Sequence, residues 1–351
     1  MMQAAKNTIA ENVGEKWIPG AHQLAPPDQR FSLDEVPDLS GKVAVVTGGS
    51  EGIGYGCAHT LLSHNIEKLF ILSRQQDIAQ DAIAALGQEM GKDKANRVVW
   101  MQCDLSDWEQ TSQTAFEIRS KTDRLDMLIN NAGRGIMTYQ RAEKNGIDLH
   151  MATNHFGHVV LTSHLLPLLT ATAAAHPATK VRIVQLSSNL HAQAPRDTAF
   201  ATLAELNTDY GAQPQYARSK LATMLYAKYL DRHLHPAHPN LLSNAVHPGI
   251  VETRQSTQHI HEAFPRLGYA MSVGAAPLKK TPLEGCVSAM FAATATLASG
   301  QYLCPPAIVE PGSAMANDVA LGERLMALTV RVLREKTRAA SVDKGCPFAL
   351  A

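Results

Sequence analysis

A tyrosine and a lysine four residues apart, Tyr216 and Lys220 in the run YARSK, could carry out acid–base chemistry. Side chains at this spacing lie on one face of a helix. A free phenol has a pKa of about 10 and is a poor acid–base catalyst at neutral pH. A neighbouring ammonium lowers that pKa, so that proton transfer to or from an alcohol oxygen becomes feasible. The spacing alone also occurs by chance in structural helices.

Three glycines form the second feature: Gly48, Gly52 and Gly54 lie between a short apolar run and a stretch with helical periodicity. A backbone without side chains can approach a pyrophosphate closely, and the positive end of a helix favours its charge. The spacing GxxxGxG differs from the GxGxxG fingerprint, and a glycine cluster alone is also compatible with a structural turn. The strand–turn–helix context favours a dinucleotide site.

The end of the next predicted strand bears on the choice of dinucleotide. A carboxylate there would accept hydrogen bonds from the adenosine ribose of NAD and repel a 2′-phosphate. This chain has Ser73 and Arg74 instead. A guanidinium has planar donors and a permanent charge that suit a phosphate. We therefore expect NADP, as NADPH, in preference to NAD, with an ordinary solvated arginine as the alternative.

An alternating α/β frame is needed to bring these residues together. Strands are expected over 42–47, 69–72, 98–101, 127–129, 181–186 and 241–246 and near residue 302. Helices are expected over 53–64, 77–90, 106–121, 143–169, 216–233 and 283–298. Such alternation implies right-handed βαβ crossovers. The predicted fold is a Rossmann-like, doubly wound, mostly parallel sheet of about seven strands, with helices on both faces of a single domain.

Three segments depart from this alternation. Residues 1–40 form an N-terminal arm without long apolar periodicity, expected either to lie extended along the domain surface or to be disordered. Within the dinucleotide-binding domain at 41–310, residues 250–283 are rich in proline and predict a substrate loop. Residues 311–351 form a C-terminal tail with a helix expected over 318–336.

Composition excludes some classes of partner. The chain of 351 residues is 45% hydrophobic and 18% charged, which is enough to build a sizeable core. Lys plus Arg and Asp plus Glu are both 32, so there is no basic excess to neutralise the phosphates of a nucleic acid. Aromatic residues make up only 5%, which also disfavours binding of single strands by stacking.

The cysteines and the N-terminus bear on location. The 5 cysteines are widely spaced and form no CxxC pair, so neither a disulfide framework nor a zinc site is expected. The first residues hold no apolar signal-peptide region, and no run approaches about 18 uninterrupted apolar residues. The sequence therefore predicts a cytoplasmic protein without an integral membrane segment.

The motifs occur in the order typical of one enzyme family. They are, along the chain, the turn Thr47–Gly54, Asp104 with Leu105, the run NNAG at 130–133, Asn154, Ser187 with Ser188, Tyr216 with Lys220, and Pro248 with Gly249. With them, residues 40–310 resemble a short-chain dehydrogenase/reductase of the classical type. The number and order of the motifs make this resemblance specific.

The resemblance implies a catalytic set of Asn154, Ser188, Tyr216 and Lys220. Ser188 would hydrogen-bond the substrate oxygen, and Tyr216 would donate the proton when a carbonyl is reduced. Lys220 would lower the pKa of Tyr216 and hold the cofactor's ribose hydroxyls, while Asn154 would organise a water that links Lys220 to solvent. The implied reaction is hydride transfer between a nicotinamide and a carbonyl or alcohol carbon of an apolar small molecule.

The expected cofactor contacts, from these residues and the resemblance together, lie along the carboxyl ends of the strands. They are Thr47, Gly48, Ser50, Gly52, Ile53, Gly54, Ser73, Arg74, Asp104, Leu105, Asn131, Ala132, Gly133, Tyr216, Lys220, Pro248, Gly249, Val251 and Thr253. No metal is expected in this mechanism. Relatives pair through the helices that carry Asn154 and Tyr216, so a homodimer is one expected state, unless an added tail covers that surface.

A finer resemblance is to the retinol-dehydrogenase-like branch, carried by NHFGH at 154–158, YARSKLA at 216–222 and VHPG at 246–249. The arm and the tail are similar to those of fungal members that act in secondary metabolism, which implies a ketone or aldehyde reductase. One departure is that Ser188 and Tyr216 lie more than twice the classical distance apart. The insert between them is therefore expected at the rim of the substrate site.

Two alternative functions stay open. A sugar-nucleotide epimerase or dehydratase on the related extended fold also uses YxxxK, but that branch usually spaces its glycines as GxxGxxG, and position 51 here is Glu51. A non-catalytic NADP-sensing protein on the same fold is the other alternative. Such proteins typically lack the tyrosine or the lysine, and both are present here.

Overall fold

One sheet organises the fold, and the computed structural model describes residues 2–251 and 280–337 of the chain. Within these residues eight strands lie in the order β3-β2-β1-β4-β5-β6-β7-β8, and all neighbouring pairs are parallel except β7 with β8. The strands are β1 (Val43–Thr47), β2 (Lys68–Ser73), β3 (Val98–Gln102), β4 (Met127–Asn130), β5 (Val181–Leu186), β6 (Leu241–Val246), β7 (Tyr302–Cys304) and β8 (Ile308–Glu310). The predicted doubly wound, mostly parallel sheet is confirmed, with the antiparallel β8 as one additional strand.

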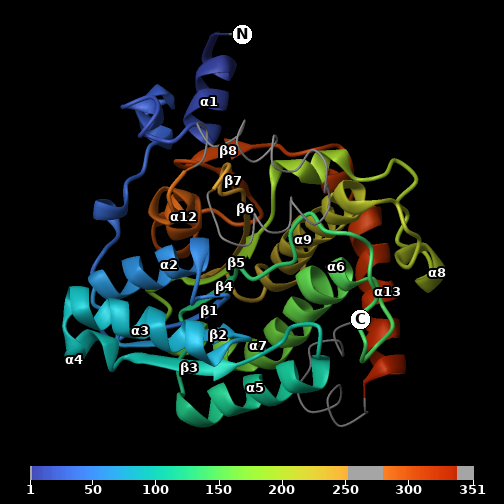
Figure 1. The fold of residues 1–351 in the computed structure, drawn as a ribbon, viewed down its shortest axis with the longest axis horizontal. Helices are drawn as coiled ribbons and strands as arrows, with labels where there is room; N and C mark the ends of the chain where they lie inside the picture. Colours follow the sequence, from blue (N-terminus) through green and yellow to red (C-terminus); the bar gives the residue numbers. More distant parts are fainter. Residues whose placement is uncertain (1, 252–279, 338–351) are drawn as a thin grey trace.

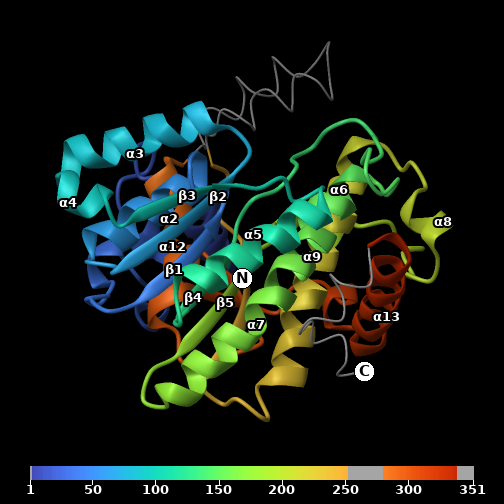
Figure 2. The same cartoon turned by 90° about the horizontal axis from the view of Figure 1, so that it is seen from below.

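Helices cover both faces of the sheet (Figures 1 and 2). One layer holds α2 (Gly52–Ser63), α3 (Gln76–Met90) and α12 (Pro282–Met290), and the other holds α5 (Trp108–Lys121), α7 (His158–Ala175) and α9 (Ala212–Leu234). Alternate residues of β1 serve the two layers: Ala44 and Val46 belong to the core beneath α2 and α12, whereas Val43 and Val45 belong to the core beneath α5 and α7. The β1 run is continuously apolar because the strand is buried on both faces.

The N-terminal arm, residues 2–40, differs from the prediction. It begins with α1 (Met2–Asn12) and continues through three 3₁₀ turns, η1 (Ala21–Leu24), η2 (Pro27–Gln29) and η3 (Leu33–Glu35). Ala10, Ala21, Ala25 and Phe31 within it are buried. The arm is therefore packed on the domain, held by small apolar anchors, and Figure 1 shows α1 lying above β8 and near α12.

The helix expected over 143–169 begins later and is interrupted. It consists of α6 (Leu149–Met151), a π-helical turn η4 (Ala152–Gly157) and then α7. The late start follows from Asp148, whose carboxylate accepts hydrogen bonds from the backbone N–H groups of His150 and Met151 and so caps the helix there. The π-turn includes Asn154, and turns of this kind are frequent at functional sites.

Shorter elements complete the described chain. They are α4 (Lys92–Ala95), η5 (Asn189–Gln193), α8 (Leu203–Leu206), η7 (Phe291–Ala295) and η8 (Met315–Asn317). The α-helical part of the helix expected over 283–298 ends at Met290 and continues as the wider π-turn η7. Most of the predicted substrate loop over 250–283 lies outside the described residues.

The C-terminal helix α13 (Val319–Lys336) packs along α9 (Figure 2). Asp318 caps its first turn by accepting a hydrogen bond from the N–H of Leu321. A second tie joins α13 to the π-turn, where His155 Nε2 lies 2.8 Å from Thr329 Oγ1. The tail thus occupies part of the helix face through which a homodimer was expected to form.

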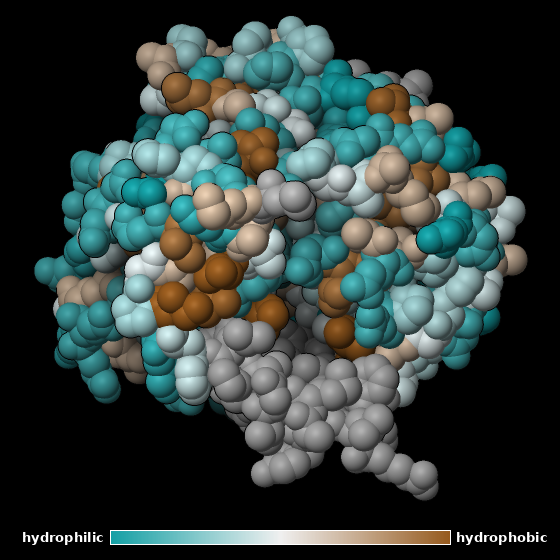
Figure 3. Space-filling view, turned by 90° about the horizontal axis from the view of Figure 1, so that it is seen from above, coloured by the Kyte–Doolittle hydropathy of each residue, from teal (hydrophilic) through white to brown (hydrophobic). Residues whose placement is uncertain are grey.

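Within residues 2–251 and 280–337, one helical segment is long and apolar enough to be considered as a membrane span, namely Leu149–Ala175. Two-thirds of its most apolar window is buried inside the domain, and the segment packs against α5, α9 and the sheet. This is the pattern of a core helix, so the segment is weak evidence for a membrane span. In the space-filling view of Figure 3, hydrophobic side chains form small separate groups on a largely hydrophilic face.

Candidate active site

The glycine turn between β1 and α2 is built for close backbone approach. Gly48 has a φ of 65°, which favours glycine, and its N–H donates to the carbonyl of Leu72 at 2.6 Å. A Cβ on Gly54 would lie only 2.1 Å from the carbonyl oxygen of Gly48. The start of α2 is therefore pressed against the turn, and its free N–H groups form an anion site that fits a pyrophosphate.

Thr47 joins this turn to the segment after β4. Its Oγ1 accepts hydrogen bonds from the backbone N–H groups of Asn131 and Ala132, each at 2.9 Å. The amide of Asn131 in turn donates to the carbonyl of Thr47 at 2.8 Å. Three hydrogen bonds therefore fix the ends of β1 and β4 side by side, at the switch point of the sheet where ligands of such folds bind.

His158 extends the same network toward Asn154. Its Nδ1 lies 3.1 Å from the carbonyl oxygen of Asn154, which can only accept, so Nδ1 carries the proton. Its Nε2 then accepts from the hydroxyl of Thr47 at 2.9 Å. Burial lowers the pKa of His158 to about 4, which keeps the ring neutral in this role. The sequence signal for this role was the four-residue spacing from Asn154.

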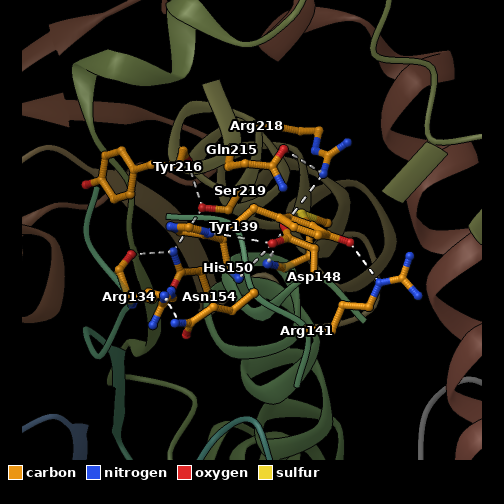
Figure 4. A network of polar contacts seen from close by, with 12 residues as sticks. Arg134, Tyr139, Arg141, Asp148, His150, Asn154, Gln215, Tyr216, Arg218 and Ser219 are labelled. Carbon is orange, nitrogen blue, oxygen red and sulfur yellow. Dashed lines mark hydrogen bonds and ion pairs between the residues drawn. The ribbon is translucent and has the colours of Figure 1, made fainter. Parts of the chain in front are cut away.

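The side chain of Asn154 holds two segments together (Figure 4). Its Oδ1 accepts from the N–H of Arg134 at 2.6 Å, and its Nδ2 donates to the carbonyl of Arg134 at 3.0 Å. The same Nδ2 donates to Ser219 Oγ at 2.9 Å, and that hydroxyl donates to the carbonyl of Tyr216 at 2.7 Å. Asn154 thus links the chain after β4 to the helix that carries Tyr216 and Lys220.

The structure brings the four expected catalytic residues to one edge of the sheet. Ser188 follows β5, and its hydroxyl forms a hydrogen bond with the phenol of Tyr216. Lys220 Nζ lies 5.6 Å from the centre of the Tyr216 ring and donates to the carbonyl of Leu186 at 2.7 Å. A Cβ on Gly133 would lie 3.2 Å from Asn154 Oδ1 and 3.4 Å from Lys220 Nζ. A side chain at that position would crowd both groups.

The electrostatics of the pair differ from the prediction. Desolvation raises the pKa of Tyr216 to about 12, while its hydrogen bond with Ser188 acts in the lowering direction. Burial also lowers the pKa of Lys220 to about 8. The net pKa shift of Tyr216 is therefore upward and set by desolvation, and Lys220, whose Nζ lies 5.6 Å from the ring centre, is not among its causes. Tyr216 is held as a neutral phenol, which is the form that can donate a proton.

The expected adenosine end of the cofactor site lies at the carboxyl ends of β2 and β3. Arg74 is exposed directly after β2, whereas the hydroxyl of Ser73 accepts a hydrogen bond from the indole of Trp100 at 2.9 Å. Asp104 Oδ1 accepts from the N–H and the hydroxyl of Ser106, at 2.9 Å and 2.7 Å. The carbonyl of Leu105 packs so closely on Gly157 that a Cβ there would approach it to 2.2 Å.

At the opposite end, Gly249 has a φ of 81° and follows Pro248 in the turn after β6. Val251 forms an isolated parallel bridge with Lys280. These residues lie at the same edge of the sheet as Ser188, because β5 and β6 are parallel neighbours. Thr253 lies outside the described residues.

The insert after β5 is held by a buried ion pair (Figure 4). Arg218 donates to the carbonyls of Glu205 and Leu206, at 2.8 Å and 2.7 Å, at the end of α8. Its guanidinium also lies 3.6 Å from Asp148 Oδ2, and both side chains are fully buried. The insert is thus fastened to the helix of Tyr216 and to the cap of α6. Sequence reasoning missed this pair, whose signal was a charged residue inside the YARSK run.

His191 shows a second fastening of the insert. Its Nδ1 lies 2.6 Å from the carbonyl oxygen of Ser188, and its Nε2 accepts from the N–H of Ser313 at 3.0 Å. Both ring nitrogens are therefore engaged by backbone groups, and burial lowers the pKa of this histidine. Within residues 2–251 and 280–337, no group of three or more His, Cys, Asp or Glu side chains is placed to hold a metal ion.

Comparisons with known proteins agree with this architecture. The family model described as short chain dehydrogenase matches residues 42–201. A Neurospora crassa protein named as a mitochondrial oxidoreductase, bli-4, is 50% identical over 351 residues, covering 99% of this chain and 84% of that protein. The short chain dehydrogenase/reductase dpchH of Colletotrichum higginsianum is 33% identical over 325 residues, covering 88% of this chain and 78% of that protein.

Solved structures show the same fold. The L-sorbose reductase of Gluconobacter frateurii, in complex with NADPH and L-sorbose, superposes with a TM-score of 0.58 at 23% identity, covering 76% of this chain and 95% of that one. The Pseudomonas aeruginosa protein RhlG, in an NADP complex, has a TM-score of 0.58 at 24% identity, covering 80% and 98%. The sites of both of these proteins hold the phosphorylated dinucleotide.

One prediction about location is wrong. The cysteines and the N-terminal residues of the sequence predict a cytoplasmic protein. The Neurospora crassa relative, which matches nearly the whole chain at 50% identity, is named as mitochondrial. Reduced, widely spaced cysteines do not distinguish a cytoplasmic from a mitochondrial protein, so the cysteine pattern was too coarse a criterion for location.

Proposed function

Because this chain belongs to the short-chain dehydrogenase/reductase family and is an oxidoreductase, we propose that it is an NADPH-dependent carbonyl reductase. Its substrate would be an apolar ketone or aldehyde, with the corresponding alcohol as product. The resemblance to fungal members supports a role in secondary metabolism. The observation that carries the proposal is the convergence of Asn154, Ser188, Tyr216 and Lys220 beside the glycine turn.

The proposed roles follow from the geometry of these side chains. The Ser188 hydroxyl, which contacts the Tyr216 phenol, would hydrogen-bond the substrate carbonyl oxygen and stabilise the charge that develops on it. Tyr216 would donate its proton to that oxygen. Bound NADPH would supply the hydride to the carbonyl carbon. Lys220, aimed at the same edge, would hold ribose hydroxyls, and Asn154 would keep the helix of Tyr216 at a fixed distance from Gly133.

A phosphorylated cofactor is supported by the exposed Arg74 at the end of β2. We expect Arg74→Ala to weaken binding of NADPH by about 1–3 kcal/mol and to leave binding of NADH nearly unchanged, because only NADPH loses a charged hydrogen bond. Calorimetric titration with each cofactor measures this difference. Lys92→Ala, which removes one positive charge from the exposed surface of α4, is the matched control. An equal loss for both cofactors would contradict the phosphate assignment.

The pKa values of the site predict a pH profile for reduction. Tyr216, with a pKa of about 12, stays protonated throughout the accessible range, whereas Lys220 loses its charge as the pH rises through about 8. We therefore expect kcat/KM for NADPH, which reports the free enzyme, to be level below pH 8 and to fall above it. Lys220→Arg keeps the positive charge and should shift this descending limb to higher pH. If the descending limb of the pH profile is unchanged in that variant, the limb reports the titration of another group.

The direct test is oxidation of NADPH across a panel of apolar ketones and aldehydes, with NADH run in parallel. Turnover that depends on Tyr216 would support the carbonyl reductase. Tight binding of NADPH without turnover on any member of the panel would favour the alternative of an NADP-sensing protein. Turnover of a nucleotide sugar without net oxidation of the cofactor would favour the epimerase.

A further inference from the structure

We propose that Lys280 is a positioning residue that ties the N-terminal arm to the turn at Pro248 and Gly249, so that the arm sets the nicotinamide end of the cofactor site. The inference rests on the proposed function, because it takes that turn as a cofactor contact. It assigns a role to a part of the chain that the sequence placed outside the dinucleotide-binding domain.

Lys280 is fully buried, and its ammonium is bound by the arm. Nζ donates to the carbonyl of Ala10 at 3.1 Å and to Nε2 of His22 at 3.2 Å. Since an ammonium only donates, His22 must accept through Nε2 and carry its own proton on Nδ1, which faces Glu15 at 3.8 Å. Burial lowers the pKa of His22, which keeps it neutral in this contact.

The backbone of Lys280 is tied to the turn after β6. Its N–H donates to the carbonyl of Ile250 at 2.7 Å, and it forms the bridge with Val251. One residue therefore binds α1 through its side chain and the turn through its main chain. A shift of the arm would therefore reach Ile250 through the side chain and the backbone N–H of Lys280.

The last turn of α1 also lies directly on Gly249. A Cβ at this position would lie 2.5 Å from the carbonyl oxygen of Glu11 and 3.1 Å from Cδ of Lys280. Together with the φ of 81°, this contact leaves room only for glycine. The positive ammonium sits at the carboxyl end of α1, where the helix dipole favours a cation.

A second contact fixes the arm to α12. The N–H of Glu15 donates to Oε1 of Glu284 at 2.7 Å, and Oε2 of Glu284 accepts from the N–H of Thr281 at 2.7 Å. Glu284 and Thr281 form the capping box of α12, which starts immediately after Lys280. Desolvation lowers the pKa of Lys280 to about 8, and the carboxylates of Glu284, Glu11 and Glu15 oppose that shift. The buried ammonium therefore requires the partners that the arm supplies, since a buried charge without partners is strongly unfavourable.

The test separates the two halves of the cofactor. NADPH spans the whole proposed site, whereas 2′,5′-ADP occupies only the adenosine half with the same 2′-phosphate. In Lys280→Met we expect the Kd for NADPH to rise about tenfold or more and the Kd for 2′,5′-ADP to stay within about twofold. Retained binding of 2′,5′-ADP also shows that the variant is folded.

Two further variants make the result specific. Deleting residues 2–12 removes the other partner of this contact, the carbonyl of Ala10, and should give the same selective loss of NADPH binding. Lys6→Met makes the same side-chain change at an exposed position of α1 and should change neither Kd. Equal weakening of both ligands by Lys280→Met, or no weakening of either, would overturn the inference. Wild-type protein that binds neither ligand would instead overturn the proposed function, and the inference with it.

Discussion

Tyr216→Phe is expected to lower kcat for carbonyl reduction by about 10²–10⁴-fold while leaving the Kd for NADPH within about twofold. The phenylalanine ring keeps the packing of tyrosine and the contact of its face with Lys220 Nζ at 5.6 Å. It lacks only the hydroxyl, which in the wild type hydrogen-bonds Ser188 and is held protonated by its raised pKa. The loss should therefore fall on the chemical step. Single-turnover loss of NADPH absorbance measures that step apart from product release.

Tyr210→Phe is the matched control for this change. Tyr210 lies within the insert and presents its hydroxyl to Asp197 at 3.2 Å, and its ring faces the guanidinium of Arg218. Removing that hydroxyl should leave kcat nearly unchanged. Full activity in Tyr216→Phe would exclude Tyr216 as the proton donor, and a large loss of NADPH binding would show that the residue acts through the cofactor site.

Arg218→Met is expected to lower the free energy of unfolding by about 3–5 kcal/mol, the second large effect. The substitution keeps an apolar stem of similar length but leaves the carboxylate of Asp148 buried without its cation. It also removes the donors that satisfy the carbonyls of Glu205 and Leu206. Denaturant titration with two spectroscopic probes measures the change, and equal midpoints from both probes support a two-state reading.

A double-mutant cycle identifies the cause of that loss. Adding Asp148→Asn removes the stranded charge but keeps an oxygen that can cap His150 and Met151, so the double variant should be more stable than Arg218→Met alone. Lys121→Met, which breaks the exposed pair with Glu117, should cost less than about 1 kcal/mol. If Arg218→Met also lowers the free energy of unfolding by less than about 1 kcal/mol, the buried pair contributes no more to stability than an exposed one.

The parts of the fold that follow local rules could be predicted from the sequence. β1 is an apolar run and β5 and β6 are mostly apolar, each followed by a turn that precedes a helix. β8 could not be predicted, because Ile308–Glu310 is too short to show any period and pairs only through the hairpin with β7. The interruption of the 149–175 helix at Asn154 likewise has no local signature, since its cause is the set of contacts with Arg134 and Ser219.

In the site, residue types could be predicted but their electrostatics could not. A motif can place Tyr216 and Lys220 on one helix face, and the structure does bring them together. The direction of the pKa shift of Tyr216 depends on how much water the surrounding chain removes, which spacing does not encode. The same holds for His158, whose neutral state and tautomer depend on Thr47, a residue 111 positions away in the chain.

The contacts of the N-terminal arm also set the order in which the protein can be completed. Ala10 meets Lys280 across 270 positions, and Glu15 meets Glu284 across 269. A ribosome adding about 5–20 residues per second needs roughly 15–50 s to make that stretch of chain. The arm therefore leaves the ribosome well before Lys280 and Glu284, and α1, which is marginal as an isolated 11-residue helix, can contact η1 but neither of these partners during that time. Docking of the arm on the turn after β6 and on α12 thus follows the synthesis of residues 280–284.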